Sequence, residues 1–198
     1  MRIAISGLSG SGNTTACANV SKELGLTVVN YTYRQLAVDL GTTFEDVRKR
    51  AGESTIIDYT LDKILLEKAK EDNIILGSRL ACWLIDADLK IWLHAPLKIR
   101  AKRIAEREGK DPKETLEYTQ KRDKSDILHY KTAYGINILK HDFTDFTINT
   151  ENLSALQVAH AVVAAAKIIP ITRKPLNAVK KIGKILNNAE TLEVTTIQ

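Results

Sequence analysis

Cysteine is scarce in this chain of 198 residues, which has two, Cys17 and Cys82, both among apolar neighbours. Two such cysteines do not make a disulfide framework, and we therefore expect a reducing compartment and a cytoplasmic location. Histidine is also rare, with four residues in the whole chain. Because His94, His141 and His160 have no partners at the spacing of metal ligands, we expect no zinc site.

The sequence also lacks a long hydrophobic run. The apolar stretch at the N-terminus is short and is interrupted by Gly7. A membrane-spanning helix needs ~20 consecutive apolar residues, so we expect neither a signal peptide nor a membrane span. Internal repeats and low-complexity segments are absent as well. With 198 residues, 44% of them hydrophobic, the chain is long enough for one main domain with a single core.

The excess of positive charge lies largely near the C-terminus. The chain has 29 Lys and Arg against 24 Asp and Glu, a net charge of +5. Residues 170–198 contribute +3 of this excess, from Arg173, Lys174, Lys180, Lys181 and Lys184 against Glu190 and Glu193. One face of the same segment is apolar, with Leu176, Val179, Ile182 and Leu186. We expect a helix packed on the body or on a neighbouring subunit. Contact with RNA is the alternative for such a basic amphipathic helix, and we expect no membrane partner.

Hydrophobic periodicity predicts strands that alternate with helices. The expected strands are residues 1–6, 26–30, 73–76, 89–93 and 146–149. The expected helices end at Gly25, cover 33–41, begin at Thr43, cover 57–69, 97–108 and 113–133, and begin at Ser154. Strands and helices in this order, joined by short links, predict an α/β fold with a parallel sheet covered by helices on both faces.

A glycine-rich stretch, GLSGSGNTT, directly follows the first expected strand. A phosphate-binding loop reads G-x-x-x-x-G-K-[ST], in which backbone N–H groups converge on phosphate oxygens. The stretch fits this pattern except that Asn13 stands in the place of the lysine. The start of the following helix also attracts anions. We predict that the whole stretch binds phosphates, through Gly7, Leu8, Ser9, Gly10, Ser11, Gly12, Asn13, Thr14 and Thr15.

The hydroxyl of Thr14 occupies the position of the P-loop Ser or Thr that binds Mg²⁺. We therefore predict Thr14 as the metal ligand, with a simple helix-capping role as the alternative.

Arginines follow the fourth expected strand at helical spacing. Arg100, Arg103 and Arg107 share one face of the expected helix. Like charges four residues apart weaken a helix by a few tenths of a kcal/mol, unless an anion lies between them. Between Lys98 and Lys131 there are eleven basic and seven acidic residues. This excess is typical of a cover for a polyphosphate, although pairing of Glu106 with Arg103 would make the face an ordinary solvated one.

Five segments together resemble the archaeal-type cytidylate kinases, within the nucleoside monophosphate kinase group of P-loop folds. They are MRIAISGLSGSGNTT, YRQLA, SRLACW, ADLKIWLHAPLKIRAKRIAEREG and RDKSDILHYKTAYGIN. The resemblance covers about residues 1–168, and 87–109 is its most specific part. Several members of the group have a small polar residue in place of the loop lysine, as Asn13 is here. The resemblance implies a kinase domain at 1–169 with a helical lid at about 108–125, followed by a basic extension at 170–198.

The resemblance implies Mg²⁺-dependent transfer of the γ-phosphoryl group from ATP to CMP or dCMP, which gives CDP or dCDP. Arg34 and Arg79 match the arginines that hold the acceptor phosphate. Arg103, Arg107 and Arg122 are then the catalytic arginines, which a closing lid brings to the phosphates of ATP.

Three positions differ from the pattern of this family. The family often has acidic residues where this chain has Tyr31 and Gly77, and a lid arginine where it has His129. These differences keep two alternatives open. One is a nucleotide-binding interaction protein that has lost turnover, and the other is a kinase for another nucleoside monophosphate.

Overall fold

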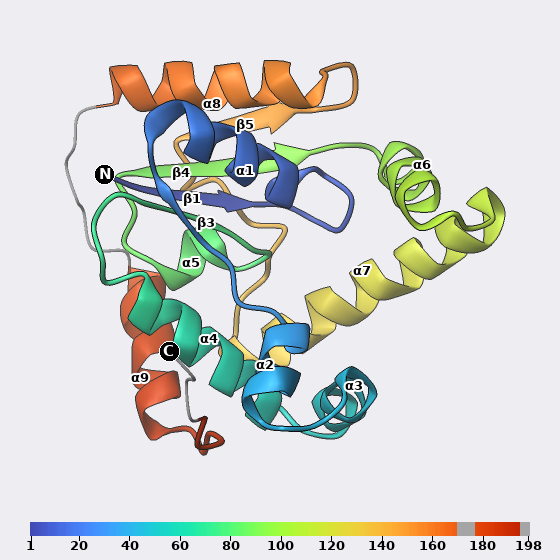
Figure 1. Ribbon diagram of the computed structural model, residues 1–198, viewed down its shortest axis with the longest axis vertical. Helices are drawn as coiled ribbons and strands as arrows, with labels where there is room; N and C mark the ends of the chain where they lie inside the picture. The colour runs from blue at the N-terminus through green and yellow to red at the C-terminus, as the bar shows by residue number, and fades with distance from the viewer. Residues whose placement is uncertain (170–176, 195–198) are drawn as a thin grey trace.

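The computed structural model describes residues 1–169 and 177–194, which contain one sheet of five parallel strands. The strand order is β2-β3-β1-β4-β5 (Figure 1). The strands are β1 (Arg2–Ser6), β2 (Thr27–Val29), β3 (Ile74–Gly77), β4 (Leu89–His94) and β5 (Phe146–Asn149). Each lies where the sequence predicts it, to within a residue or two at the ends.

The described helices alternate with these strands. They are α1 (Asn13–Leu24), α2 (Tyr33–Asp39), α3 (Phe44–Glu53), α4 (Ile56–Lys68), α5 (Ala81–Leu84), α6 (Leu97–Glu108), α7 (Pro112–Tyr134), α8 (Ala155–Ile168) and α9 (Asn177–Asn188). The short helix α5 is the one that hydrophobic periodicity did not predict. None of the helices in the described part of the chain is long and apolar enough to cross a membrane.

Helices cover both faces of the sheet, as predicted. On one face, α1 and α8 pack against each other and against β1, β3 and β4, with Val20 and Val162 fully buried between them. On the other face lie α4, α5 and α9, around Trp83 and Leu65 (Figure 1). The central strand β1 is buried from both sides, with Ile3 and Ile5 on the face of α1 and α8 and Ala4 on the other face. Strands buried on both faces are typical of parallel sheets in α/β proteins.

Several helix boundaries follow from local side-chain chemistry. Gly25 ends α1 at φ 65°, a left-handed conformation that favours glycine. The side chain of Thr43 accepts a hydrogen bond from the N–H of Asp46 at the start of α3. Ser154 and Gln157 form a reciprocal capping box at the start of α8. The predicted starts at Thr43 and Ser154 are therefore confirmed.

The C-terminal helix α9 packs on the body of the protein. Its apolar residues Ile182 and Leu186 are fully buried, and α9 contacts α5, α4 and α7. Its lysines point outward, at Lys180, Lys181 and Lys184. Packing on the body, one of the two expected placements, is confirmed, and no observation supports RNA contact. Arg173, Lys174 and Leu176 lie outside the described residues.

Candidate active site

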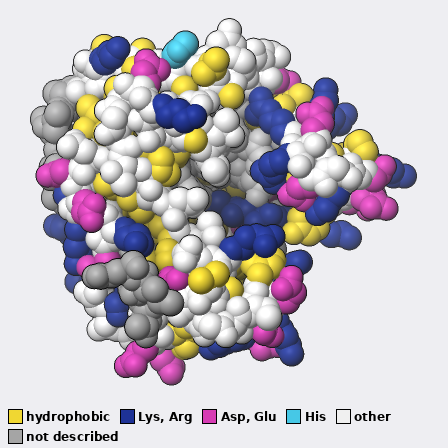
Figure 2. All heavy atoms as spheres, in the orientation of Figure 1, with side chains coloured by type: hydrophobic (Ala, Val, Ile, Leu, Met, Phe, Trp, Pro, Cys, Tyr) yellow, Lys and Arg dark blue, Asp and Glu magenta, His cyan; other side chains and the backbone are white. Residues whose placement is uncertain are grey.

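One pocket of about 1360 Å³ collects the predicted site residues. All of residues 7–15 line it, together with each predicted arginine: Arg34, Arg79, Arg103, Arg107 and Arg122. The pocket lies between the carboxyl ends of β1 and β3 and the helices α2, α4, α6 and α7. Figure 2 shows dark-blue Lys and Arg side chains around the hollow beside the projecting part of the molecule. Ligands of open α/β sheets bind at this edge.

The phosphate loop joins β1 to α1 in a conformation that requires glycine. Gly10 and Gly12 have φ values of 81° and 106°, where a side chain is strained. A Cβ atom on Gly7 would lie 2.4 Å from the carbonyl oxygen of Leu93, so there is no room for one. No side chain caps the start of α1 among the described residues. Its first N–H groups are therefore available to an anion.

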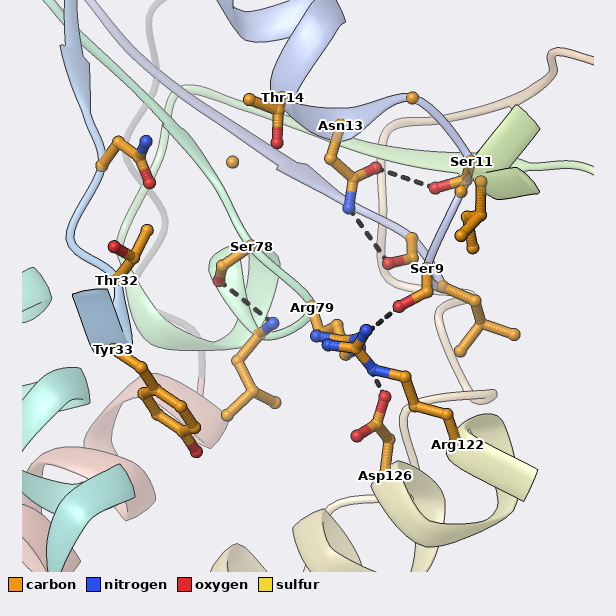
Figure 3. A pocket seen from close by; sticks show the side chains of 18 of the residues that line it. Ser9, Ser11, Asn13, Thr14, Thr32, Tyr33, Ser78, Arg79, Arg122 and Asp126 are labelled. Carbon is orange, nitrogen blue, oxygen red and sulfur yellow. Dashed lines mark hydrogen bonds and ion pairs between the residues drawn. The ribbon is translucent and has the colours of Figure 1, made fainter. Parts of the chain in front are cut away.

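Asn13 is engaged inside the loop rather than in the open pocket. Its Nδ2 donates to the carbonyl oxygen of Gly7 at 3.0 Å, and Ser11 Oγ donates to Asn13 Oδ1 at 3.0 Å (Figure 3). Both polar atoms of the amide therefore hold the loop in shape. The side chain supplies no positive charge, so any charge on the phosphates must be met from elsewhere.

Arg79 connects the phosphate loop with α7. Its Nη2 donates to Ser9 Oγ, and its Nε lies 2.6 Å from Asp126 Oδ2, so the three side chains form a row (Figure 3). Burial raises the pKa of Asp126, and the charges of Arg79 and Arg122 oppose that rise. Arg79 is thus fixed between the loop and the helix, with its guanidinium on the pocket wall.

Arg100 lies behind the loop and is a structural residue. It is buried and donates from both terminal nitrogens to Asp123, at 3.2 and 2.7 Å. It also donates to the carbonyl oxygens of Ala95 and Ser9. This bidentate pair joins α6, α7 and the phosphate loop. Arg100 therefore does not belong to a row of free cations, although its helical spacing to Arg103 and Arg107 placed it on one face with them.

The two catalytic candidates on α6 have different surroundings. Arg103 is partly buried and donates to Thr150, to Oγ1 at 2.9 Å and to the carbonyl oxygen at 2.5 Å. Thr150 Oγ1 in turn donates to the carbonyl oxygen of Ser11 in the phosphate loop. Arg107 is exposed and pairs with Glu108 at 2.8 Å. Glu106, the partner considered for Arg103, lies 3.8 Å from Lys102 instead.

Arg122 and Arg34 lie on the sides of the pocket. Arg122 is exposed on α7, one turn before Asp126. Arg34 is exposed on α2, and its guanidinium carbon lies 4.5 Å from the centre of the Phe44 ring. Such stacking orients an arginine while its N–H groups remain free for other acceptors.

The end of the pocket beyond Arg79 holds acidic and aromatic side chains. Tyr33 donates its hydroxyl to Asp58 Oδ1 at 2.5 Å, and His129 Nε2 lies 3.3 Å from Asp58 Oδ2. Burial raises the pKa of Asp58, whereas the hydrogen bond from Tyr33 and the charge of His129 oppose that rise. One turn along α4, Asp62 accepts a hydrogen bond from the Tyr134 hydroxyl at 2.6 Å. Burial raises the pKa of Asp62 to about 7.

The residues present fit a magnesium ion that arrives with a nucleotide. Thr14 is exposed on the first turn of α1 and lines the pocket. Within the described ranges no group of three His, Cys, Asp or Glu side chains is placed to hold a metal. Mg²⁺ in phosphoryl-transfer sites keeps several waters and is bound mainly by substrate phosphates. A single hydroxyl at the helix start therefore suits this mode of binding.

Gly77 stands where the family often has an acidic residue, and close packing against α1 explains the glycine in this chain. A Cβ atom on Gly77 would lie 2.5 Å from Cys17 Sγ on α1. A carboxylate side chain fits there only if the Cys17 side chain or α1 shifts. Sequence reasoning also gave no role to Asp58 and Asp62, although their spacing of four residues on one expected helix placed them on the same face.

The family model and the relatives that match this chain in sequence all belong to the cytidylate kinases. A model of the cytidylate kinase-like family matches residues 2–152. The cytidylate kinase of Thermococcus kodakarensis is 40% identical over 151 residues, which are 75% of this chain and 78% of that protein. The cytidylate kinase of Natronomonas pharaonis is 42% identical over 171 residues, which are 84% of this chain and 88% of that protein.

Solved structures share the fold at low identity. Shikimate kinase from Acinetobacter baumannii in complex with shikimate has a TM-score of 0.57 and 16% identity, over 85% of this chain and 95% of that one. Deoxyadenosine kinase from M. mycoides with dCMP and dCDP bound has a TM-score of 0.54 and 20% identity, over 84% and 99%. These likenesses concern the fold alone, and they agree with the P-loop kinase fold expected from the sequence. The match to the family model and the relatives at 40% and 42% identity together show that the chain belongs to the cytidylate kinase-like family.

Proposed function

We propose that this protein transfers the γ-phosphoryl group of ATP to CMP or dCMP in the presence of Mg²⁺, giving CDP or dCDP. As a member of the cytidylate kinase-like family it is a nucleoside monophosphate kinase. The observation that carries the proposal is one pocket that joins a phosphate loop to arginines on three helices and on the loop after β3. In the reaction an oxygen of the acceptor phosphate attacks the γ-phosphorus, and ADP leaves with the electrons of the broken bond.

The phosphates of ATP are assigned to residues 7–15. The N–H groups of the loop and the start of α1 face an anion there, and the glycines allow it to approach the backbone. The Thr14 hydroxyl would bind the magnesium ion, which neutralises phosphate charge when it is bound. Among the described residues, Arg79 beside Ser9 and the arginines of α6 and α7 are cations near this end of the pocket, and we assign the role of the missing lysine to those of α6 and α7.

Arg103, Arg107 and Arg122 are the proposed catalytic residues. Arg103 is already held beside the loop by Thr150, whereas Arg107 and Arg122 are exposed. We assign residues 108–125, which span the turn at Gly109 and the first half of α7, to a lid that closes over ATP. Closure would bring the two exposed guanidinium groups to the transferred phosphoryl group and exclude water. The lid belongs to a catalytic domain at 1–169, and 170–198 is an extension.

Arg34 and Arg79 are assigned to the acceptor phosphate. They lie on α2 and on the loop after β3, beyond the phosphate loop. Arginine binds phosphate with two parallel hydrogen bonds, which fixes orientation as well as charge. A cytoplasmic location completes the proposal, since Cys17 and Cys82 are buried free thiols.

A panel of acceptors tests the proposal. Purified protein with ATP and Mg²⁺ is assayed for ADP production with CMP, dCMP, UMP, AMP and GMP. We expect the fastest turnover with the cytidine nucleotides. Preference for a different monophosphate would refute the acceptor. ATP binding without ADP production from any acceptor would favour the nucleotide-binding interaction protein instead.

A further inference from the structure

The carboxylates that line the pocket lie on two helices. Among the described residues they are Asp58 and Asp62 on α4 and Asp126 on α7. Asp58 and Asp62 are four residues apart and therefore lie on the same face of α4. Carboxylates repel phosphate groups, so this face of α4 is matched to a ligand group that donates hydrogen bonds.

The three carboxylates differ in their partners. Asp126 pairs with Arg79, which also bonds Ser9 of the phosphate loop, so Asp126 belongs to the phosphate side of the pocket. Within the described residues Asp58 has no Lys or Arg partner and contacts Tyr33 and His129. The acid nearest the proposed phosphate sites is thus neutralised, and the acid on α4 is not paired with a permanent cation.

The acidic face of α4 also has unused capacity to accept hydrogen bonds. Asp62 is more than nine-tenths buried, with 6% of its surface exposed. Tyr134 donates to its Oδ2, but no described residue donates to its Oδ1. Asp58 accepts one hydrogen bond, from Tyr33 at Oδ1, and His129 Nε2 lies 3.3 Å from its Oδ2, whereas a carboxylate offers about four lone-pair sites. Because these carboxylate oxygens line the pocket and have acceptor sites left over, this face of the pocket favours a ligand with N–H groups.

Aromatic rings surround the same carboxylate. Tyr33, His129 and Tyr130 all line the pocket beside Asp58. The hydroxyl of Tyr33 is bonded to Asp58, which holds the ring against this end of the pocket. A nucleobase stacks favourably on an aromatic ring, whichever base it is. Flat rings next to an acceptor therefore fit a planar base that bears an amino group.

We propose that Asp58 accepts a hydrogen bond from the exocyclic amino group of the acceptor base and thereby determines the preference for cytosine over uracil. The proposal rests on the proposed function. Cytosine has an N–H donor at the ring position where uracil has a carbonyl oxygen. The Asp58 carboxylate accepts from the former and faces only lone pairs on the latter. Sites that hydrogen-bond a substrate group discriminate strongly against an analogue that leaves their polar atoms unpaired.

Steady-state kinetics of full-length variants test this role. kcat/KM is measured for CMP and for UMP at saturating ATP and Mg²⁺, with wild type, Asp58→Asn and Asp58→Ser. Both substitutions remove the charge, and the asparagine amide can donate to the oxygen of uracil. We expect the ratio of CMP to UMP efficiency to fall at least tenfold, with the KM for ATP within about twofold of wild type.

Asp142→Asn is the matched control, since Asp142 is exposed and lies outside the pocket. Its CMP to UMP ratio is expected to equal that of wild type. A purely structural role of Asp58 would lower both efficiencies in parallel and leave the ratio unchanged, which would overturn the inference. Thermal unfolding shows which of the two Asp58 variants is folded. The CMP to UMP efficiency ratio of either folded variant is enough to test the role of Asp58.

The same data separate this inference from the proposed function. A wild-type chain that prefers CMP, together with a folded Asp58 variant of unchanged ratio, overturns the role of Asp58 alone. A wild-type chain without preference for CMP over UMP overturns both.

Discussion

Replacement of Asn13 by alanine should be mild for turnover and measurable for stability. The substitution removes two hydrogen bonds of 3.0 Å, one to the carbonyl oxygen of Gly7 and one from Ser11 Oγ. A typical intramolecular hydrogen bond contributes about 0.5–1.5 kcal/mol. We therefore expect the free energy of unfolding to fall by about 1–3 kcal/mol. Because the neutral amide brings no charge to the phosphates, turnover should stay within about tenfold of wild type, or ~1.4 kcal/mol.

Arg122→Ala should have the opposite effect, with little loss of stability and a large loss of turnover. Arg122 is exposed on α7, so its removal should cost little stability. Loss of a charged contact that forms in the transition state should instead cost about 2–4 kcal/mol, or roughly 30- to 1000-fold in kcat. Both variants and wild type are compared by urea unfolding and by ADP production at one Mg²⁺ concentration. Abolished turnover in Asn13→Ala with near-normal turnover in Arg122→Ala would refute the idea that arginines of the lid replace the lysine.

Two further predictions concern the acceptor end. Arg34→Ala and Arg79→Ala should each lose about 2–4 kcal/mol of transition-state stabilisation, because the acceptor phosphate loses charge and orientation. ATP affinity, measured by calorimetric titration, should stay nearly unchanged, and an equal loss of ATP binding would contradict the assignment. Asp62 has a pKa raised by burial from 3.8 to about 7, so its contribution to stability is present below about pH 4 and is lost as the pH rises through about 7. Relative to wild type, Asp62→Asn should therefore gain free energy of unfolding between these pH values, and a difference that is flat with pH would contradict the raised pKa.

The fold could be predicted from the sequence because its signals are local. Runs such as residues 89–93, apolar except for Lys90, mark strands buried on both faces. Gly25 and Ser154 mark helix ends by backbone and side-chain chemistry that involves only near neighbours. The exception is α5, residues Ala81–Leu84, which is four residues long and wholly buried. A single buried turn has no polar face, so it leaves no periodic pattern to read.

The loop and the arginines that line the pocket could also be predicted, but its acidic residues Asp58 and Asp62 and the partners of its side chains could not. Glycines and arginines at the carboxyl ends of parallel strands must meet at one edge of the sheet. Helical spacing says which residues share a face of α6, yet not that Asp123 would bind Arg100 and bury it. That pairing depends on how α7 crosses α6. The opposed carboxylate lies 23 positions further along the chain, at a separation where local patterns carry no information.

Two features of this chain determine where positive charge lies near the phosphate loop. One is Asn13 in place of a lysine, and the other is the buried pair of Arg100 with Asp123. A lysine in the phosphate loop would meet the phosphates as soon as ATP binds, because the loop is fixed between β1 and α1. In this chain the amide closes the loop on itself, and Arg100 binds the carbonyl oxygen of Ser9 while its charge is met by Asp123. In the proposed reaction, positive charge for the transferred phosphoryl group would then come from arginines on the pocket-facing parts of α6 and α7. Since the buried pair joins these helices to the loop, any movement that brings Arg107 and Arg122 inward is expected to turn about that point.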